Sequence, residues 1–266
     1  FVVENYLEFE IDLLRMAAEN IMHHHDNSIS RNNNRNLLNR RIMNLLSVCR
    51  GYLDQSAKHV NKMYGSKSKI SNEFNDLQSN YCDNVFGYRF LVKLRNYVQH
   101  YDVPVNIIGF HHEIDRNENH ESKFSHKVIP YIRLSQLEHD KIIKREIIAE
   151  LKSFVKDDRI DLRKFIREYV ESIGKIHETF REMIKSDLNS WEKIYLSSFD
   201  KIKNITSEKQ ISFVSLIAIY DNKKWKERVP LPKNILERRE LLELKNRQFH
   251  NLHRSEEHTS ELQSPT

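Results

Sequence analysis

The chain has 266 residues, of which 30% are charged, five are glycine and five are proline, and its formal net charge is +5. This composition predicts long helices joined by few turns, and it excludes a β-rich fold, which needs more turn residues. No apolar run is long enough to cross a membrane and no secretory signal is evident, so we expect a soluble, cytoplasmic protein. The basic charge fits both a role in solubility and an anionic partner such as RNA.

Both ends of the chain affect the prediction. The sequence begins at Phe1 rather than at a methionine, so we expect the first helix to lack upstream residues. The segment RSEEHTSELQS, from Arg254 to Ser264, resembles the translation of a sequencing-library adapter, and residues 254–266 are therefore left out of the fold prediction. That segment carries one Arg and three Glu, so removing it raises the formal charge from +5 to +7.

Helical spacing of apolar residues dominates the first hundred residues. It predicts helices at about residues 6–21, 34–64 and 71–101. Gly65 and the polar residues after it end the second helix, and a serine-rich start offers capping for the third. Pro104 ends the third helix, because a proline pushes the residue before it out of the helical region. Residues 1–104 are therefore predicted to form a helical bundle.

After Pro104 the spacing changes from helical to extended. Residues 105–110 and 127–134 are short β-like runs that flank the polar segment 111–126. This arrangement predicts a hairpin with a long loop. Pro130 lacks the amide hydrogen that a central strand needs, so we expect its strand to lie at a sheet edge.

Helical spacing returns over residues 136–204, with a break near Asp157. The second of the two helices implied would be about 40 residues long, which suggests a bend or an antiparallel partner. A second hairpin is predicted over residues 211–229 and a final helix over 232–250. The fold class is thus mainly α, with an N-terminal bundle followed by an α+β region over 105–253 that contains short hairpins and a long helix.

One cluster has a composition suited to catalysis, namely Arg95, Asn96 and His100 in the sequence RNYVQH at the C-terminal end of the third predicted helix. Asn96 and His100 share a helix face, while Arg95 and His100 lie about 140° apart on adjoining flanks. The negative end of the helix dipole favours a protonated His100, as a general acid requires. Arg95 offers a charged fork for a phosphoryl group, and Asn96 can orient the imidazole or bind a phosphate oxygen.

The same three residues also have a purely structural interpretation. In it, His100 caps its own helix and Asn96 is solvated. Arg95 then pairs with a carboxylate such as Asp102. The spacing alone does not decide between the two interpretations, because it is common in a chain with this many Arg and His residues. Two other pairs fit a looser version of it: Arg133 with His139, and Arg247 with His253.

The segment FLVKLRNYVQHYDVP, residues 90–104, resembles the signature of the HEPN superfamily, whose helical-bundle domains carry R-N-x-x-x-H near the end of a helix. The resemblance implies a metal-independent endoribonuclease without a cofactor, in which Arg95 stabilises the transition state, Asn96 orients and His100 acts as acid and base. It also implies attack by the RNA 2′-hydroxyl and two motifs meeting across a homodimer.

Members of that superfamily occur in toxin–antitoxin, abortive-infection and CRISPR systems. The resemblance therefore implies RNA as substrate, a second copy of the chain as partner, and an antitoxin or another defence component as a further partner. Some HEPN domains are not catalytic. The alternative function is accordingly a helical module for dimerisation or protein interaction.

Three further groups of residues suggest chemistry but have simpler interpretations. Consecutive histidines on a helix point in different directions and do not converge on one metal ion. A histidine-rich polar segment between the first predicted strands is interpreted as a solvated loop. A basic and aromatic segment in the second hairpin is interpreted as a strand edge protected by lysine, with RNA contact as the alternative. The groups are His23, His24, His25 and Asp26; His111, His112, Glu113, His120 and His126; and Lys223, Lys224, Trp225, Lys226 and Arg228.

Overall fold

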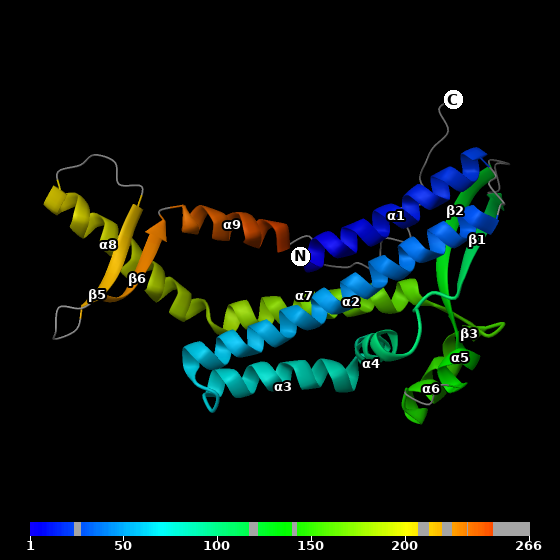
Figure 1. Cartoon of the computed structure of the whole chain (residues 1–266), viewed down its shortest axis with the longest axis horizontal. Helices are drawn as coiled ribbons and strands as arrows, with labels where there is room; N and C mark the ends of the chain where they lie inside the picture. The colour runs from blue at the N-terminus through cyan, green and yellow to red at the C-terminus, as the bar shows by residue number, and fades with distance from the viewer. Residues whose placement is uncertain are drawn as a thin grey trace. The chain divides into compact units, whose positions relative to one another are not determined.

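The computed structural model is mainly helical, which confirms the predicted fold class (Figure 1). Its described residues form two compact units, one within residues 1–176 and the other within residues 177–246. The boundary between the two units therefore follows Ile176. The sequence instead suggested a boundary after residue 104, where the apolar spacing changes from helical to extended. The reason is that the first sheet packs against the N-terminal helices. The structure describes residues 1–23, 28–116, 122–139, 143–206, 213–219, 225–232 and 234–246.

The first unit opens with two long helices, α1 (Val2–His23) and α2 (Ser28–Tyr64), which confirm the first two predicted helices. They pack along each other, and α2 begins earlier than expected (Figure 1). Gly65 ends α2 with a φ of +92°, a left-handed conformation that glycine adopts without strain. The next helix is capped by Ser68, whose Oγ accepts a hydrogen bond of 3.1 Å from the Ser71 amide.

The third predicted helix is two helices, α3 (Lys69–Asn84) and α4 (Phe86–His100). Between them the chain is extended at Val85, with φ −114° and ψ 108°. The Gly87 amide donates a hydrogen bond of 3.0 Å to Glu168 Oε2, from a helix much later in the chain. A Cβ at Gly87 would lie 2.1 Å from that oxygen, so the approach requires glycine. The break depends on this distant partner, which apolar spacing does not reveal.

The bundle core lies between these four helices and the first part of α7 (Leu162–Met183). Both α3 and α4 pack against α2 as well as against each other. Aromatic rings join α4 to α7, since Phe90 meets Phe165 edge to face with centroids 5.2 Å apart. The largest buried side chains of the bundle are Phe9, Met16, Leu38, Ile42, Leu45, Leu46, Leu53, Phe74, Phe90, Tyr97, Phe165 and Tyr169.

A four-stranded antiparallel sheet follows, in the order β1-β2-β4-β3. It confirms the predicted first hairpin, but the expected long loop is wrong, because paired strand continues to Arg116 and resumes at Ser122. The edge position expected for Pro130 is also wrong. Pro130 lies in β2, which is central, and no residue of β4 stands opposite it, so its missing N–H interrupts no bond to β4. The strands are β1 (Ile107–Arg116), β2 (Ser122–Arg133), β3 (Val155–Lys156) and β4 (Arg159–Asp161).

The helical stretch predicted before Asp157 is divided into short pieces. A tight turn follows them, in which Asp157 and Asp158 both have positive φ, 51° and 61°. The long helix predicted after Asp157 is interrupted at Ile184, which separates α7 from the next helix. Across the described residues, every helix is too short or too polar to span a membrane. The short pieces are α5 (Leu134–His139), α6 (Arg145–Leu151) and the 3-10 turn η1 (Lys152–Phe154).

The second unit contains the end of α7, another long helix, a hairpin and a final helix. The predicted second hairpin is confirmed, with an irregularity between Ala218 and Ile219, and its turn at Asp221 and Asn222 lies outside the described residues. The elements are α8 (Lys185–Thr206), β5 (Phe213–Ile219), β6 (Trp225–Pro232) and α9 (Ile235–Asn246).

Candidate functional site

Helix α4 carries all three residues of the predicted motif, and His100 is its last residue. Tyr101 leaves the helical conformation with φ −132° and ψ −68°. The apolar side of α4 is buried in the bundle, whereas Asn96 and His100 are exposed and Arg95 is half-buried. The motif therefore lies along the outer side of α4 and at its C-terminal end, as the helix period predicts.

Arg95 is the motif residue whose surroundings are most unusual. Its Nη1 donates a hydrogen bond of 3.4 Å to the Oδ1 of Asn96. Its Nε is buried and has no hydrogen-bond partner. In the described part of the chain, no carboxylate pairs with its guanidinium group. Asp102 instead accepts a hydrogen bond of 2.7 Å from the Val103 amide and contacts the side-chain amide of Gln136.

His100 has few contacts. Its ring meets the Tyr101 ring edge to face, with centroids 6.5 Å apart. Among the described residues its imidazole makes no hydrogen bond, so it does not cap α4. The geometry thus lacks both the cap and the ion pair of the purely structural interpretation. The structure leaves the imidazole accessible to solvent one turn beyond Asn96.

The sequence did not indicate that the charge of Arg95 acts on a buried tyrosine. Tyr169 of α7 is buried, and burial raises the pKa of its hydroxyl well above the ordinary value. The positive charges of Arg50 and Arg95 act in the opposite direction on the same pKa. Arg50 also binds Asp54 with a hydrogen bond of 3.1 Å.

The chain just beyond α4 is fixed by a buried asparagine. Asn39 of α2 donates a hydrogen bond of 3.1 Å from Nδ2 to the Val105 carbonyl. Its Oδ1 accepts one of 2.7 Å from the Val105 amide. The end of the helix that carries His100 is therefore tied to α2 five residues further along the chain.

Within the histidine-rich segment, His111, His112, Glu113 and His126 lie in paired strands, which corrects their interpretation as part of a loop. His112 and His126 stand opposite each other, with their Nδ1 atoms 2.5 Å apart. His111 Nε2 lies 2.9 Å from the Tyr131 hydroxyl. Among the described residues, no three His, Cys, Asp or Glu side chains gather as a metal site. The predicted candidates outside the described residues are His24, His25, Asp26, His120, Lys223, Lys224, Arg247 and His253.

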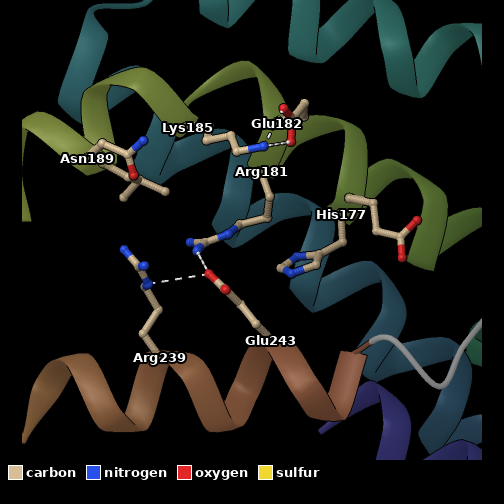
Figure 2. A pocket seen from close by; sticks show the side chains of 9 residues that line it. His177, Arg181, Glu182, Lys185, Asn189, Arg239 and Glu243 are labelled. Carbon is tan, nitrogen blue, oxygen red and sulfur yellow. Dashed lines mark hydrogen bonds and ion pairs between the residues drawn. The ribbon is translucent and has the colours of Figure 1, made fainter.

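The second unit contains a cavity of about 340 Å³ between α7, α8 and α9. Figure 2 shows Arg181 and Arg239 both directed at Glu243 inside it, and Arg181 Nη2 lies 2.5 Å from Glu243 Oε1. Burial lowers the pKa of His177 at its wall, and the charge of Arg181 lowers it further. The charges in this cavity are largely paired with one another, and no motif residue lines it.

Comparison with known proteins gives no relative: no protein-family model, curated protein or solved structure matches the chain. The resemblance of residues 90–104 to the HEPN signature therefore stays a prediction from sequence.

Proposed function

We propose that this protein is a metal-independent endoribonuclease of the HEPN type, with Arg95, Asn96 and His100 as its active site. The observation that carries the proposal is the state of Arg95. Its guanidinium group is half-buried, its Nε lacks a partner, and no described carboxylate neutralises it. A permanent cation held in this way, beside an exposed histidine, is suited to a phosphate group.

The chemistry follows from these residue types. The 2′-oxygen of a ribose attacks the adjacent phosphorus, and an imidazole accepts the hydroxyl proton. Negative charge grows on the phosphoryl oxygens, where the Arg95 guanidinium stabilises it. The bond from phosphorus to the 5′-oxygen breaks, and an imidazolium returns a proton to that oxygen. The products are a cyclic phosphate and a 5′-hydroxyl.

Each chain supplies one such histidine, whereas the reaction uses a base and an acid. The resemblance implies that a second copy supplies the other imidazole. The exposure of Asn96 and His100 supports this arrangement, because a second chain can still reach both side chains. The same exposure also supports the competing function, a non-catalytic module in which this surface only binds a partner. A role in bacterial stress or anti-phage defence, with an antitoxin or defence component as partner, belongs to the proposal as well.

The test is cleavage of mixed RNA by the purified chain in EDTA. Replacing Arg95 or His100 by alanine should slow cleavage at least about a hundredfold, because each removes a group that acts in the transition state. The matched control is His139→Ala, since His139 is also exposed and ends a helix but lies outside the motif. End-group analysis should find cyclic phosphate and 5′-hydroxyl termini.

Two results would contradict the nuclease. One is wild-type protein that cuts no faster than His100→Ala. The other is His139→Ala that loses as much activity as His100→Ala, which would mean that the effect is not specific to the motif. Either result would favour the interaction module.

A further inference from the structure

Helix α1 has apolar residues on two opposite sides. One side is buried against α2 and β2 and contributes Tyr6, Phe9, Leu13 and Met16 to the core. The other side faces outward and remains exposed in the described structure. Its large side chains are 43–59% exposed, which is unusual for four aliphatic residues on one helix. We call this outer row the α1 seam: Leu7, Ile11, Leu14, Ala18 and Ile21.

The spacing of the α1 seam is that of a coiled coil. Its members follow one another at intervals of four, three, four and three residues. This is the alternation of the a and d positions of a heptad, with Ile11 and Ala18 at a. Helix α1 has 22 residues, which corresponds to about 33 Å, or three heptads. A seam that is exposed over this length is suited to a second helix of the same length.

We propose that the α1 seam pairs with the α1 seam of a second copy of this chain, as an antiparallel two-helix coiled coil. In this arrangement each a position packs against a d position of the second copy. Ile11 then lies opposite Leu14 of the other chain, and Leu7 opposite Ala18. The contact is self-complementary about a twofold axis, as a closed dimer requires.

The charges that flank the seam select this orientation. Glu8 and Arg15 occupy e positions, and their side chains are 50% and 45% exposed. Within the chain Glu8 contacts Arg41, and Arg15 binds Glu19 at 2.8 Å, so contacts to a second chain would form in exchange for these surface pairs. Antiparallel pairing places Glu8 of each chain beside Arg15 of the other, which gives two complementary contacts per dimer. Parallel pairing would instead direct Arg15 towards Glu10. The Glu10 side chain is only 18% exposed and its partner Arg167, at 2.9 Å, is 8% exposed, so Glu10 exchanges partners less readily than the half-exposed Glu8.

This dimer does not depend on the nuclease proposal. Helix α1 packs against α2 and β2, whereas α4, which carries the motif, packs against α2 and α3. A failed cleavage assay would therefore leave the α1 seam unaffected. A monomeric chain would rule out both the α1 dimer and an active site shared by two copies, and the cleavage assay would then test Arg95 and His100 within a single chain.

The first experiment measures the molar mass of the purified full chain by light scattering and sedimentation. The expected mass is at least twice the 32.0 kDa of one chain, because a separate pairing across the motif, as the proposed function implies, would add further copies. Ile11→Glu places a charge in the seam twice per dimer and should weaken association at least about a hundredfold. The matched control is Ile29→Glu on α2, because Ile29 is 71% exposed and lies outside the seam. Circular dichroism checks that both variants remain folded.

The second experiment tests the orientation by disulfide cross-linking in a Cys82→Ser background, since Cys82 is partly accessible and Cys49 is buried. Leu7→Cys and Ala18→Cys chains, when mixed and oxidised, should cross-link to each other. Leu7→Cys alone should not, because antiparallel pairing separates its two copies by about 16 Å along the helix.

In a parallel pair, Leu7→Cys alone would cross-link and the mixture of Leu7→Cys with Ala18→Cys would not form the mixed product. That result would overturn the proposal. A monomeric wild-type chain would overturn it too, because the α1 seam would then not be covered by a second copy. A dimer that tolerates Ile11→Glu would show that another surface associates, and this also overturns it.

Discussion

The contact between Gly87 and Glu168 predicts that Gly87→Ala destabilises the wild-type protein but stabilises a Glu168→Ala variant. Gly87 lies in the first turn of α4, where Val85 provides no side-chain cap. The Glu168 carboxylate takes the place of that cap by accepting the Gly87 amide hydrogen at 3.0 Å. A Cβ at Gly87 would lie 2.1 Å from Oε2 and 3.1 Å from the Glu168 Cβ. Gly87→Ala therefore displaces the carboxylate from the helix end.

Two opposing contributions set the size of the change in the free energy of unfolding caused by Gly87→Ala. A hydrogen bond to a charged group contributes about 1.5–3 kcal/mol, which Gly87→Ala removes. Alanine in place of glycine stabilises a helix by about 1 kcal/mol. The net expectation is a loss of about 0.5–2 kcal/mol in the free energy of unfolding. In a Glu168→Ala background the bond is already absent, so Gly87→Ala should stabilise the protein by up to about 1 kcal/mol.

The assay is urea unfolding of the four members of this cycle, followed by far-ultraviolet circular dichroism. Hydrogen exchange of peptides from α4 then locates the effect within the first unit. Gly51→Ala is the matched control, because Gly51 lies inside α2 with open space around its Cα. It should stabilise the protein by about 0.5–1 kcal/mol. If Gly87→Ala changes stability equally in both backgrounds, the carboxylate does not cap α4 and the reasoning is refuted.

Three further substitutions test other contacts. Asn39→Leu leaves the amide and carbonyl of Val105 buried without partners and should cost about 2–4 kcal/mol, whereas an unchanged urea midpoint would argue against that pairing. Arg167→Met removes the 2.9 Å partner of the part-buried Glu10 and should cost about 1.5–3 kcal/mol by the same titration; a loss below about 1 kcal/mol would contradict a stabilising ion pair. Burial lowers the pKa of His177, so its stabilising effect is complete above about pH 6.5 and declines as the pH falls through that value. The thermal midpoint of His177→Gln should therefore fall less on acidification than that of wild type, and parallel decreases would contradict this.

The long helices were predictable from sequence because the apolar spacing of each one depends on that helix alone. The apolar spacing of α1 and α2 depends only on which face each helix buries, and the structure agrees. Gly65 ended α2 as predicted, since the positive φ at that position is a local property. The first hairpin was also recognised, although its length was not.

The errors arose where a distant residue decides the local structure. The break before α4 depends on Glu168, which lies 81 residues beyond Gly87. The central position of Pro130 depends on β4, a strand of three residues that is too short to show a pattern. The surroundings of Arg95 show the same limit, because its charge acts on the pKa of Tyr169, which lies on α7, 74 residues further along the chain. Sequence thus located the motif on the end of a helix but not the residues around it.

The tethers of α4 determine how variants of the motif should behave. Glu168 holds the start of the helix, and the paired hydrogen bonds of Asn39 to Val105 hold the chain after its end. The motif side chains contribute little to either tether, because Asn96 and His100 are exposed. A loss of function in variants of Asn96 or His100 would therefore not come from unfolding, whereas Arg95→Ala changes a half-buried side chain and needs its own stability measurement.

His100→Ala should accordingly change the free energy of unfolding by no more than about 0.5 kcal/mol. Urea titration of this variant beside His139→Ala checks the expectation, since both histidines are exposed and end a helix. A much larger loss for His100→Ala would mean that the imidazole supports the fold. The cleavage assay could then no longer separate chemistry from stability at that position. Equal stability of the two variants would make their difference in cleavage a direct measure of what the His100 imidazole does.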